Sequence, residues 1–104
     1  TVMSETLVTF DEAIMDSMGR RYFAQAVGEK RDDGLWQGWL EFLPVATTDT
    51  LRSGRETTQP NRTDLEYWAQ GLTRVYLAGA LARAQNPSRE TEREQDELGS
   101  AEGS

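Results

Sequence analysis

The first half of the chain alternates between apolar and polar side chains in the way that β-strands do. Residues 6–10 are β-branched or aromatic and residues 21–30 alternate, so each range predicts a strand. Residues 35–45 carry large apolar groups on both alternating faces, which is typical of a central strand. An Asp-Gly pair between these last two ranges predicts a hairpin turn. Residues 50–58 alternate weakly and predict an edge strand, whereas residues 11–18 fit either a helical turn or a continued edge strand.

The second half changes to helical spacing. Thr63 and Glu66 match a capping box, which predicts that a helix begins there, and Asn61 is the alternative cap. A stripe predicted to face the core then repeats at helical spacing: Leu65, Trp68, Leu72, Val75, Tyr76, Gly79 and Ala82, with Leu77 and Leu81 widening it. Gly71 either lies within one long helix or breaks it, in which case Thr73 caps the second helix.

These elements predict an α+β fold. An antiparallel β-meander of three to four strands packs on one long C-terminal helix, intact or broken, in two layers. We expect a single domain over residues 1–87, because the residue before Pro87 leaves the helical region. Residues 88–104 hold six acids, two arginines and one large apolar residue, Leu98. Such a segment buries too little apolar surface to offset its ordering entropy, which predicts a disordered acidic tail.

Composition narrows the function classes. The chain has no histidine and no cysteine, so the commonest general base and the thiolate nucleophile are missing. This argues against an enzyme, and we predict neither a metal nor a cofactor. The net charge of −7 is opposite to the basic groove that nucleic-acid binders place beside their aromatic residues. No stretch approaches the roughly 18 apolar residues of a membrane span, and we expect a cytoplasmic protein.

A polar cluster precedes the helix and is the first candidate site. It consists of six residues: Arg55, Thr57, Thr58, Gln59, Asn61 and Arg62. Helix N-termini favour anions because their amides are free and the helix dipole is positive there. The cluster therefore predicts either an anion or small-molecule site or, alternatively, a turn, a cap and a solvated edge strand.

An apolar sheet face is the second candidate. Leu35, Trp39 and Leu43 share one face of the predicted central strand, and a single helix covers only the other face. Exposed together, they would form a patch of the kind that marks an interface, with a protein partner or with a second copy in a homodimer. The leading hypothesis is therefore a small protein–protein interaction or regulatory domain without enzymatic activity. The alternative hypothesis is a binder of anions or small molecules.

Two resemblances add context. The runs WQGWLEF, GRETTQPNRTDLEYWAQGLT and VYLAGALARA, within about residues 20–84, resemble a group of short bacterial proteins with no assigned activity. The order of the predicted elements is also similar to that of HicB-type antitoxin domains. Those domains carry Pro-Asp-Leu-Pro-Gly after the second strand, where this chain has Phe42-Leu43-Pro44-Val45. The resemblances imply a bacterial protein and assign no functional residue.

Overall fold

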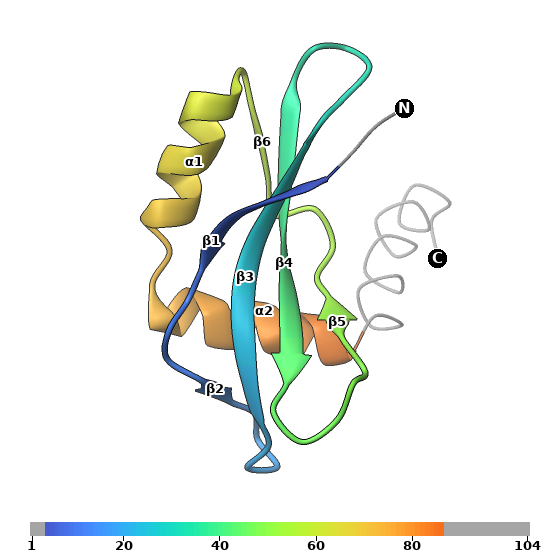
Figure 1. Cartoon of the computed structure of the whole chain (residues 1–104), viewed down its shortest axis with the longest axis vertical. Coiled ribbons are helices and arrows are strands. Elements are labelled where there is room, and N and C mark those ends of the chain that lie inside the picture. The colour runs from blue at the N-terminus through green and yellow to red at the C-terminus, as the bar shows by residue number, and fades with distance from the viewer. Residues whose placement is uncertain (1–3, 87–104) are drawn as a thin grey trace, which may run out of the picture.

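Residues 4–86 are described by a computed structural model and form an α+β fold with one antiparallel sheet and two helices (Figure 1). The elements are β1 (Glu5–Thr9), β2 (Ile14–Met15), β3 (Arg21–Lys30), β4 (Trp36–Pro44), β5 (Leu51–Arg52), β6 (Thr57–Gln59), α1 (Arg62–Gln70) and α2 (Arg74–Gln85). β3 and β4 are central, with β1 and β2 paired to β3 and with β5 and β6 paired to β4. Residues 4–86 thus hold six strands rather than the predicted three to four, because the strands on both flanks are interrupted.

The β3–β4 hairpin confirms the strongest local prediction. The two strands pair antiparallel in continuous register from Tyr22 opposite Pro44 to Lys30 opposite Trp36. Gly34 takes a φ of 87° in the connecting turn, a value that glycine adopts without a steric cost. The amide of Leu35 donates to the Asp33 side chain at 3.0 Å, which fixes the turn. The hairpin is local in sequence, so its alternation and turn residues were sufficient to predict it.

The strand predicted over residues 50–58 is instead two short strands separated by a bulge. Arg52 lies opposite Glu41 and Thr57 lies opposite Gly38, so Ser53 to Glu56 face only two residues of β4. Ser53 replaces the missing strand partner, since its hydroxyl accepts from the Leu40 amide at 3.0 Å and its amide donates to the Leu40 carbonyl at 2.8 Å. The bulge places the Glu56 side chain within hydrogen-bonding distance of Tyr76 and Arg83 on α2.

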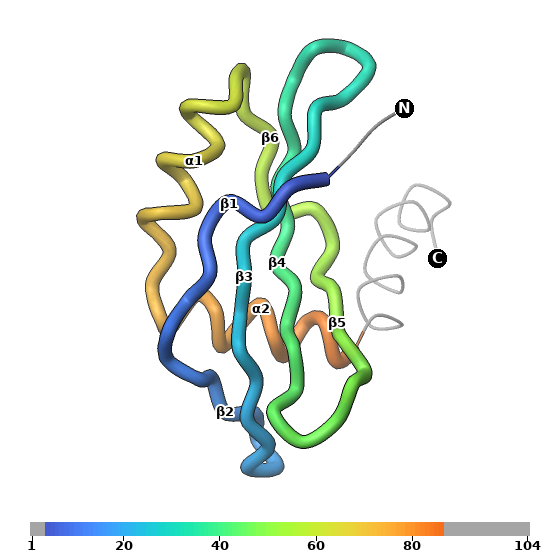
Figure 2. Tube along the Cα trace, in the orientation of Figure 1, coloured from blue at the N-terminus to red at the C-terminus, as the bar shows by residue number. Residues whose placement is uncertain are grey.

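The single long helix is a wrong prediction, and the broken alternative is correct. α1 ends at Gly71, whose amide donates to the carbonyls of Tyr67 and Trp68, each at 3.2 Å. Thr73 then caps α2 by accepting from the Tyr76 amide at 3.2 Å. Figure 2 shows the chain turning sharply between the two helices, so that α2 crosses behind β3 and β4.

The cap of α1 is also not the predicted capping box. Asn61 is the N-cap, and its side-chain oxygen accepts from the Asp64 amide at 2.8 Å. Thr63 lies inside the helix and is exposed. An asparagine two residues earlier reaches the first free amides, which leaves the Thr63 hydroxyl without that role.

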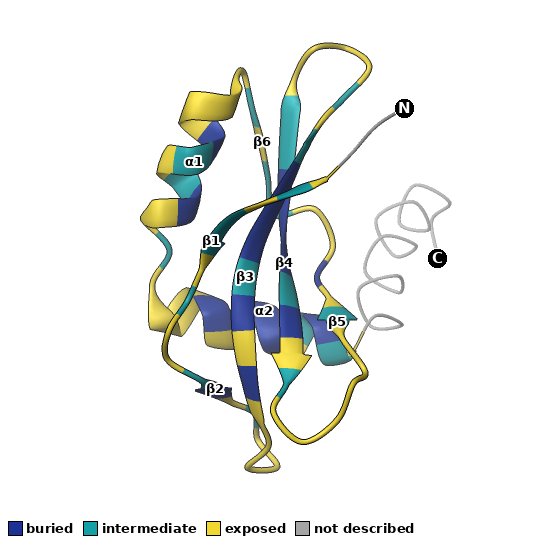
Figure 3. Ribbon diagram, in the orientation of Figure 1, coloured by how far each residue is buried: buried dark blue, intermediate teal, exposed yellow. Residues whose placement is uncertain are grey.

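The core is formed by buried residues of the sheet and of both helices, which are dark blue in Figure 3. β3 and β4 contribute the even-numbered side chains, and α2 contributes Leu77, Ala80, Leu81 and Ala84. The predicted stripe is wrong on α2, because Val75 is 84% exposed and Ala82 is exposed. The chain changes direction at Gly71 and begins a separate helix, so the apolar stripe of α1 does not continue along α2.

Paired glycines seat α1 on the sheet. Gly28 and Gly38 are direct partners in β3 and β4. A Cβ atom at Gly38 would lie 2.8 Å from the Trp68 ring and 2.9 Å from a Leu65 methyl group, and one at Gly28 would overlap the other Leu65 methyl group. Leu65 is completely buried between these glycines. Close approach of α1 therefore depends on two positions without side chains.

Within residues 4–86, neither helix has the length and apolar character needed to span a membrane. The predicted acidic tail, residues 88–104, lies outside the described residues.

Candidate functional site

The polar cluster predicted as an anion site is divided among structural roles. Arg62 pairs with Glu5 at 2.5 Å and with Glu66 at 3.1 Å. The hydrogen bond that Arg62 donates to Glu5 raises the pKa of Arg62 above its usual value. The guanidinium is therefore already occupied by two carboxylates, which also make the N-terminus of α1 less attractive to an anion.

The other members of the cluster make no common site with Arg62. Gln59 donates to the Thr57 hydroxyl at 2.7 Å, and the Thr57 methyl group lies on the Gly38 side of the sheet. Asn61 is the helix cap. Arg55, in the bulge, and Thr58, on β6, are exposed. This arrangement favours the turn-and-cap interpretation of the cluster.

The predicted interface is not a continuous patch. Leu35, beside the hairpin turn, and Leu43, near the other end of β4, are each 39% exposed, whereas Trp39 between them is only 3% exposed. The expectation that Trp39 is exposed is wrong, because the guanidinium of Arg52 lies 4.0 Å from the centre of its ring. The Trp39 indole also donates to Glu41 at 3.2 Å, which holds the ring against the sheet.

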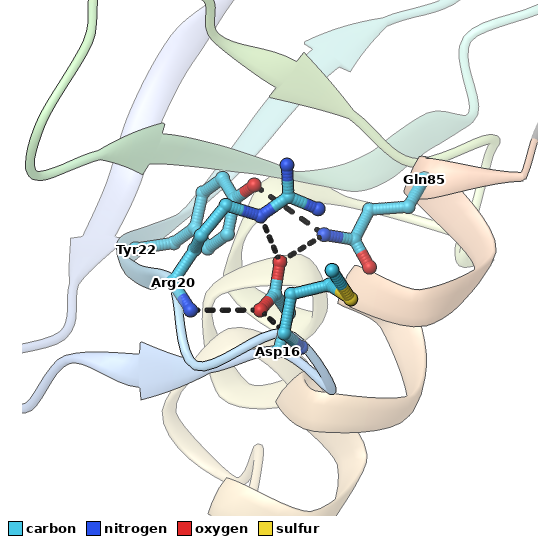
Figure 4. Close-up of polar contacts among 5 residues, drawn as sticks. Asp16, Arg20, Tyr22 and Gln85 are labelled. Carbon is cyan, nitrogen blue, oxygen red and sulfur yellow. Dashed lines mark hydrogen bonds and ion pairs between the residues drawn. The ribbon is translucent and has the colours of Figure 1, made fainter.

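A carboxylate that the sequence did not reveal joins the β2–β3 turn to the end of α2 (Figure 4). The Asp16 side chain is 1% exposed and accepts from the amides of Met18 and Arg20, at 2.9 and 2.8 Å, and from Gln85 at 2.7 Å. Burial alone would raise the pKa of Asp16, but these bonds and the Arg20 guanidinium outweigh it and lower the pKa to about 2. Gln85 also donates to the Tyr22 hydroxyl at 3.3 Å.

A second enclosed carboxylate joins the bulge to α2. The Glu56 side chain is 6% exposed, and one of its oxygens accepts from the Tyr76 hydroxyl at 2.5 Å and from Arg83 at 2.7 Å. Burial and the bond to Glu56 raise the pKa of Tyr76 to about 12, although Arg83 opposes this shift. Tyr76 and Arg83 are two turns apart on α2, so the cluster fixes the rotation of the helix about its axis.

Polar side chains of α2 therefore bind partners in other parts of the same chain. Arg74 pairs with Glu12, Arg83 pairs with Glu56, and Gln85 binds Asp16. The side of α2 that faces away from the sheet carries Val75, Ala78 and Ala82, all exposed, with Gly79 half-buried beside them. We call these four residues the outer face of α2. None of the four has a polar side chain, and the Arg83 guanidinium lies at the edge of the face beside Gly79. Sequence periodicity assigned three of the four residues to the core.

Among residues 4–86, no group of three or more acidic, histidine or cysteine side chains is arranged to hold a metal ion. Comparisons of the chain with protein-family models, with curated proteins and with solved structures find no match.

Proposed function

We propose that this chain is a protein–protein interaction domain without enzymatic activity, and that it pairs with a second copy of itself through the outer face of α2. The observation that carries the proposal is the absence of polar side chains from that exposed face, within the described residues. A helix on the surface of a protein normally carries polar side chains on the face opposite to its buried stripe. Here one side is buried by the sheet, and Val75 on the other side is 84% exposed.

A second copy suits this face because the face is complementary to itself. Its one larger residue, Val75, and its small residue Ala82 lie on opposite sides of the midpoint between Ala78 and Gly79. A two-fold axis through that midpoint places Val75 of each copy against Ala82 of the other. Small residues at the centre allow the two helices to approach closely, since interaxial distance depends on the side chains at the contact.

The two arginines of α2 do not oppose this pairing. Arg74 and Arg83 lie near the two ends of α2, and each is paired with a carboxylate of its own chain, Glu12 and Glu56. Two helices can therefore meet without placing unpaired like charges against each other.

The enclosed carboxylates support a structural rather than a catalytic role. A general acid needs a pKa near the working pH, and the pKa of Asp16 is about 2. Glu56 is held by Tyr76 and Arg83 in the manner of a structural ion pair. Both groups fasten α2 to the sheet and thereby fix which face of α2 points outward.

Sedimentation velocity at micromolar concentration tests the proposal. The parent should sediment as a dimer, and Ala78→Glu should sediment as a monomer, because two carboxylates would meet at the two-fold axis. Glutamate costs little helix propensity, so the variant should remain folded by circular dichroism. The matched control is Thr58→Glu, at an exposed position on β6, which should remain dimeric. A monomeric parent, or a dimer that survives Ala78→Glu, contradicts the proposal.

A further inference from the structure

A pocket lies where β3 begins and β4 ends, at the lower end of the sheet in Figure 1. Its volume is about 540 Å³, and its lining includes Arg20, Arg21, Tyr22, Val45, Asp49 and Leu51. We propose that this pocket binds an acidic peptide segment with an apolar side chain, and that the segment is residues 88–104 of the same chain. The inference goes beyond the proposed dimer, because no residue of the outer face of α2 lines the pocket.

The pocket combines cationic and apolar groups. Arg21 is exposed, and no carboxylate of residues 4–86 lies within 4.0 Å of it. Arg20 pairs with Asp16, yet 63% of its side chain remains exposed. Val45, 49% exposed, and the half-buried Leu51 add apolar surface beside the two guanidinium groups. Asp49 is the one acid in the lining, and because Arg20 is already paired with Asp16, Arg21 is the arginine available to bind a carboxylate.

The chain itself supplies a segment with the complementary chemistry. Residues 88–104 carry six acids against two arginines, and their one large apolar residue, Leu98, directly follows Asp96-Glu97. An acidic pair next to a leucine matches the exposed Arg21 next to the apolar surface of Val45 and Leu51. The rest of the chain, with nine basic and twelve acidic residues between Ser4 and Asn86, has no comparable excess of charge.

α2 ends beside the pocket, so the segment that follows it is within reach. Gln85 donates to the hydroxyl of Tyr22, a lining residue, at 3.3 Å, so the chain leaves α2 beside the pocket. From Asn86 to Leu98 an extended chain spans up to about 40 Å, so Leu98 can reach a pocket that lies beside the end of α2. Attachment to the same chain gives an effective concentration of the order of millimolar, so even a weak site is occupied.

Backbone amide chemical shifts of the full chain test this proposal. The variant Asp96→Ser/Glu97→Ser/Leu98→Ser should shift the amides of Arg21 and of residues 45–51 relative to the parent. Raising the salt concentration should move the parent amides in the same direction, because exposed charge pairs are screened. Arg21→Glu should reproduce the tail variant, whereas Arg55→Glu, a charge reversal at another exposed arginine, should leave the amides of residues 45–51 unchanged.

Three results would overturn the proposal. The first is identical pocket amides in the parent and the triple-serine variant. The second is an equal effect of Arg21→Glu and Arg55→Glu, which would indicate general screening. The third is pocket shifts that grow with protein concentration, which would place the segment of a second copy in the pocket. All measurements can be repeated in Ala78→Glu, so failure of the dimer and failure of the pocket are distinguishable.

Discussion

Replacing Gly28 with alanine tests how α1 is held on the sheet. Gly28 and Gly38 face α1 as cross-strand partners, and the two methyl groups of Leu65 occupy the space that their side chains would fill. A methyl group at Gly28 would overlap Leu65 Cδ2 and lie 3.0 Å from Leu7 Cδ1. Leu65 cannot rotate away, because it is fully buried and its other methyl group already lies over Gly38.

Two opposing effects set the expected magnitude. Overpacking a filled core costs about 1–3 kcal/mol. Alanine also lowers the conformational entropy of the unfolded chain relative to glycine, which stabilises the folded state by about 0.4–1 kcal/mol. The midpoints of the two ranges leave a net loss of about 1.3 kcal/mol in the free energy of unfolding. For a domain of this size that loss lowers the melting temperature by roughly 5–10 °C.

Thermal and urea unfolding of a mutant cycle measure the effect. Gly28→Ala should be costly in the parent and nearly neutral in a Leu65→Val background, which removes the overlapping Cδ atoms. Contacting residues commonly couple by about 0.5–3 kcal/mol in such cycles. Gly71→Ala is the control, since its added Cβ would meet only ordinary contacts at 3.6 and 3.7 Å. The reasoning fails if Gly28→Ala melts at or above the parent, or if its cost is unchanged by Leu65→Val.

Three further predictions follow from the caps and the enclosed carboxylates. Asn61→Ala should lower stability by about 1 kcal/mol in urea unfolding, whereas Thr63→Ala should unfold like the parent. The pKa of Asp16 is lowered from 3.8 to about 2, so its contribution to stability is present above about pH 4 and is lost as the pH falls towards 2. Asp16→Asn should therefore have a lower free energy of unfolding at neutral pH. Its free energy of unfolding should also fall less between about pH 4 and pH 2 than that of the parent, as measured by urea unfolding at each pH. An equal fall in the two proteins would contradict this prediction. The pKa of Tyr76 is raised from 10.0 to about 12, so its contribution is present below pH 10 and is lost as the pH rises towards 12. Ultraviolet titration of the folded protein should show a late ionisation from Tyr76, and Tyr76→Phe should remove that step.

Local elements could be predicted from the sequence because their determinants are close together along the chain. The β3–β4 hairpin depends on alternation and on one turn, both visible in residues 21–45. The two caps also follow from short polar signals, although Asn61 and Thr63 could be distinguished only by the geometry of the chain entering α1.

The features that orient α2 could not be predicted in this way. Gln85 is 69 residues from Asp16, and Arg83 is 27 residues from Glu56. Such distant partners leave no periodic signal, and in the sequence Glu56 resembles an ordinary surface residue of an edge strand. Periodicity therefore centred the stripe of α2 on Val75, with Leu77 and Leu81 at its margin, whereas these contacts rotate α2 so that Leu77 and Leu81 are buried and Val75 is exposed. The outer face that carries the proposed function results from that rotation.

Isotope-filtered nuclear Overhauser spectroscopy on a mixture of labelled and unlabelled chains tests the central claim most directly, because it locates the contact between copies. Pairing through the outer face of α2 predicts intermolecular cross-peaks between the Val75 methyl groups of one copy and the Ala82 methyl group of the other, with Ala78 close to its own counterpart. Intermolecular cross-peaks confined to Phe23 or Leu43 on the opposite sheet face, or none at concentrations where the parent should be dimeric, would contradict the account.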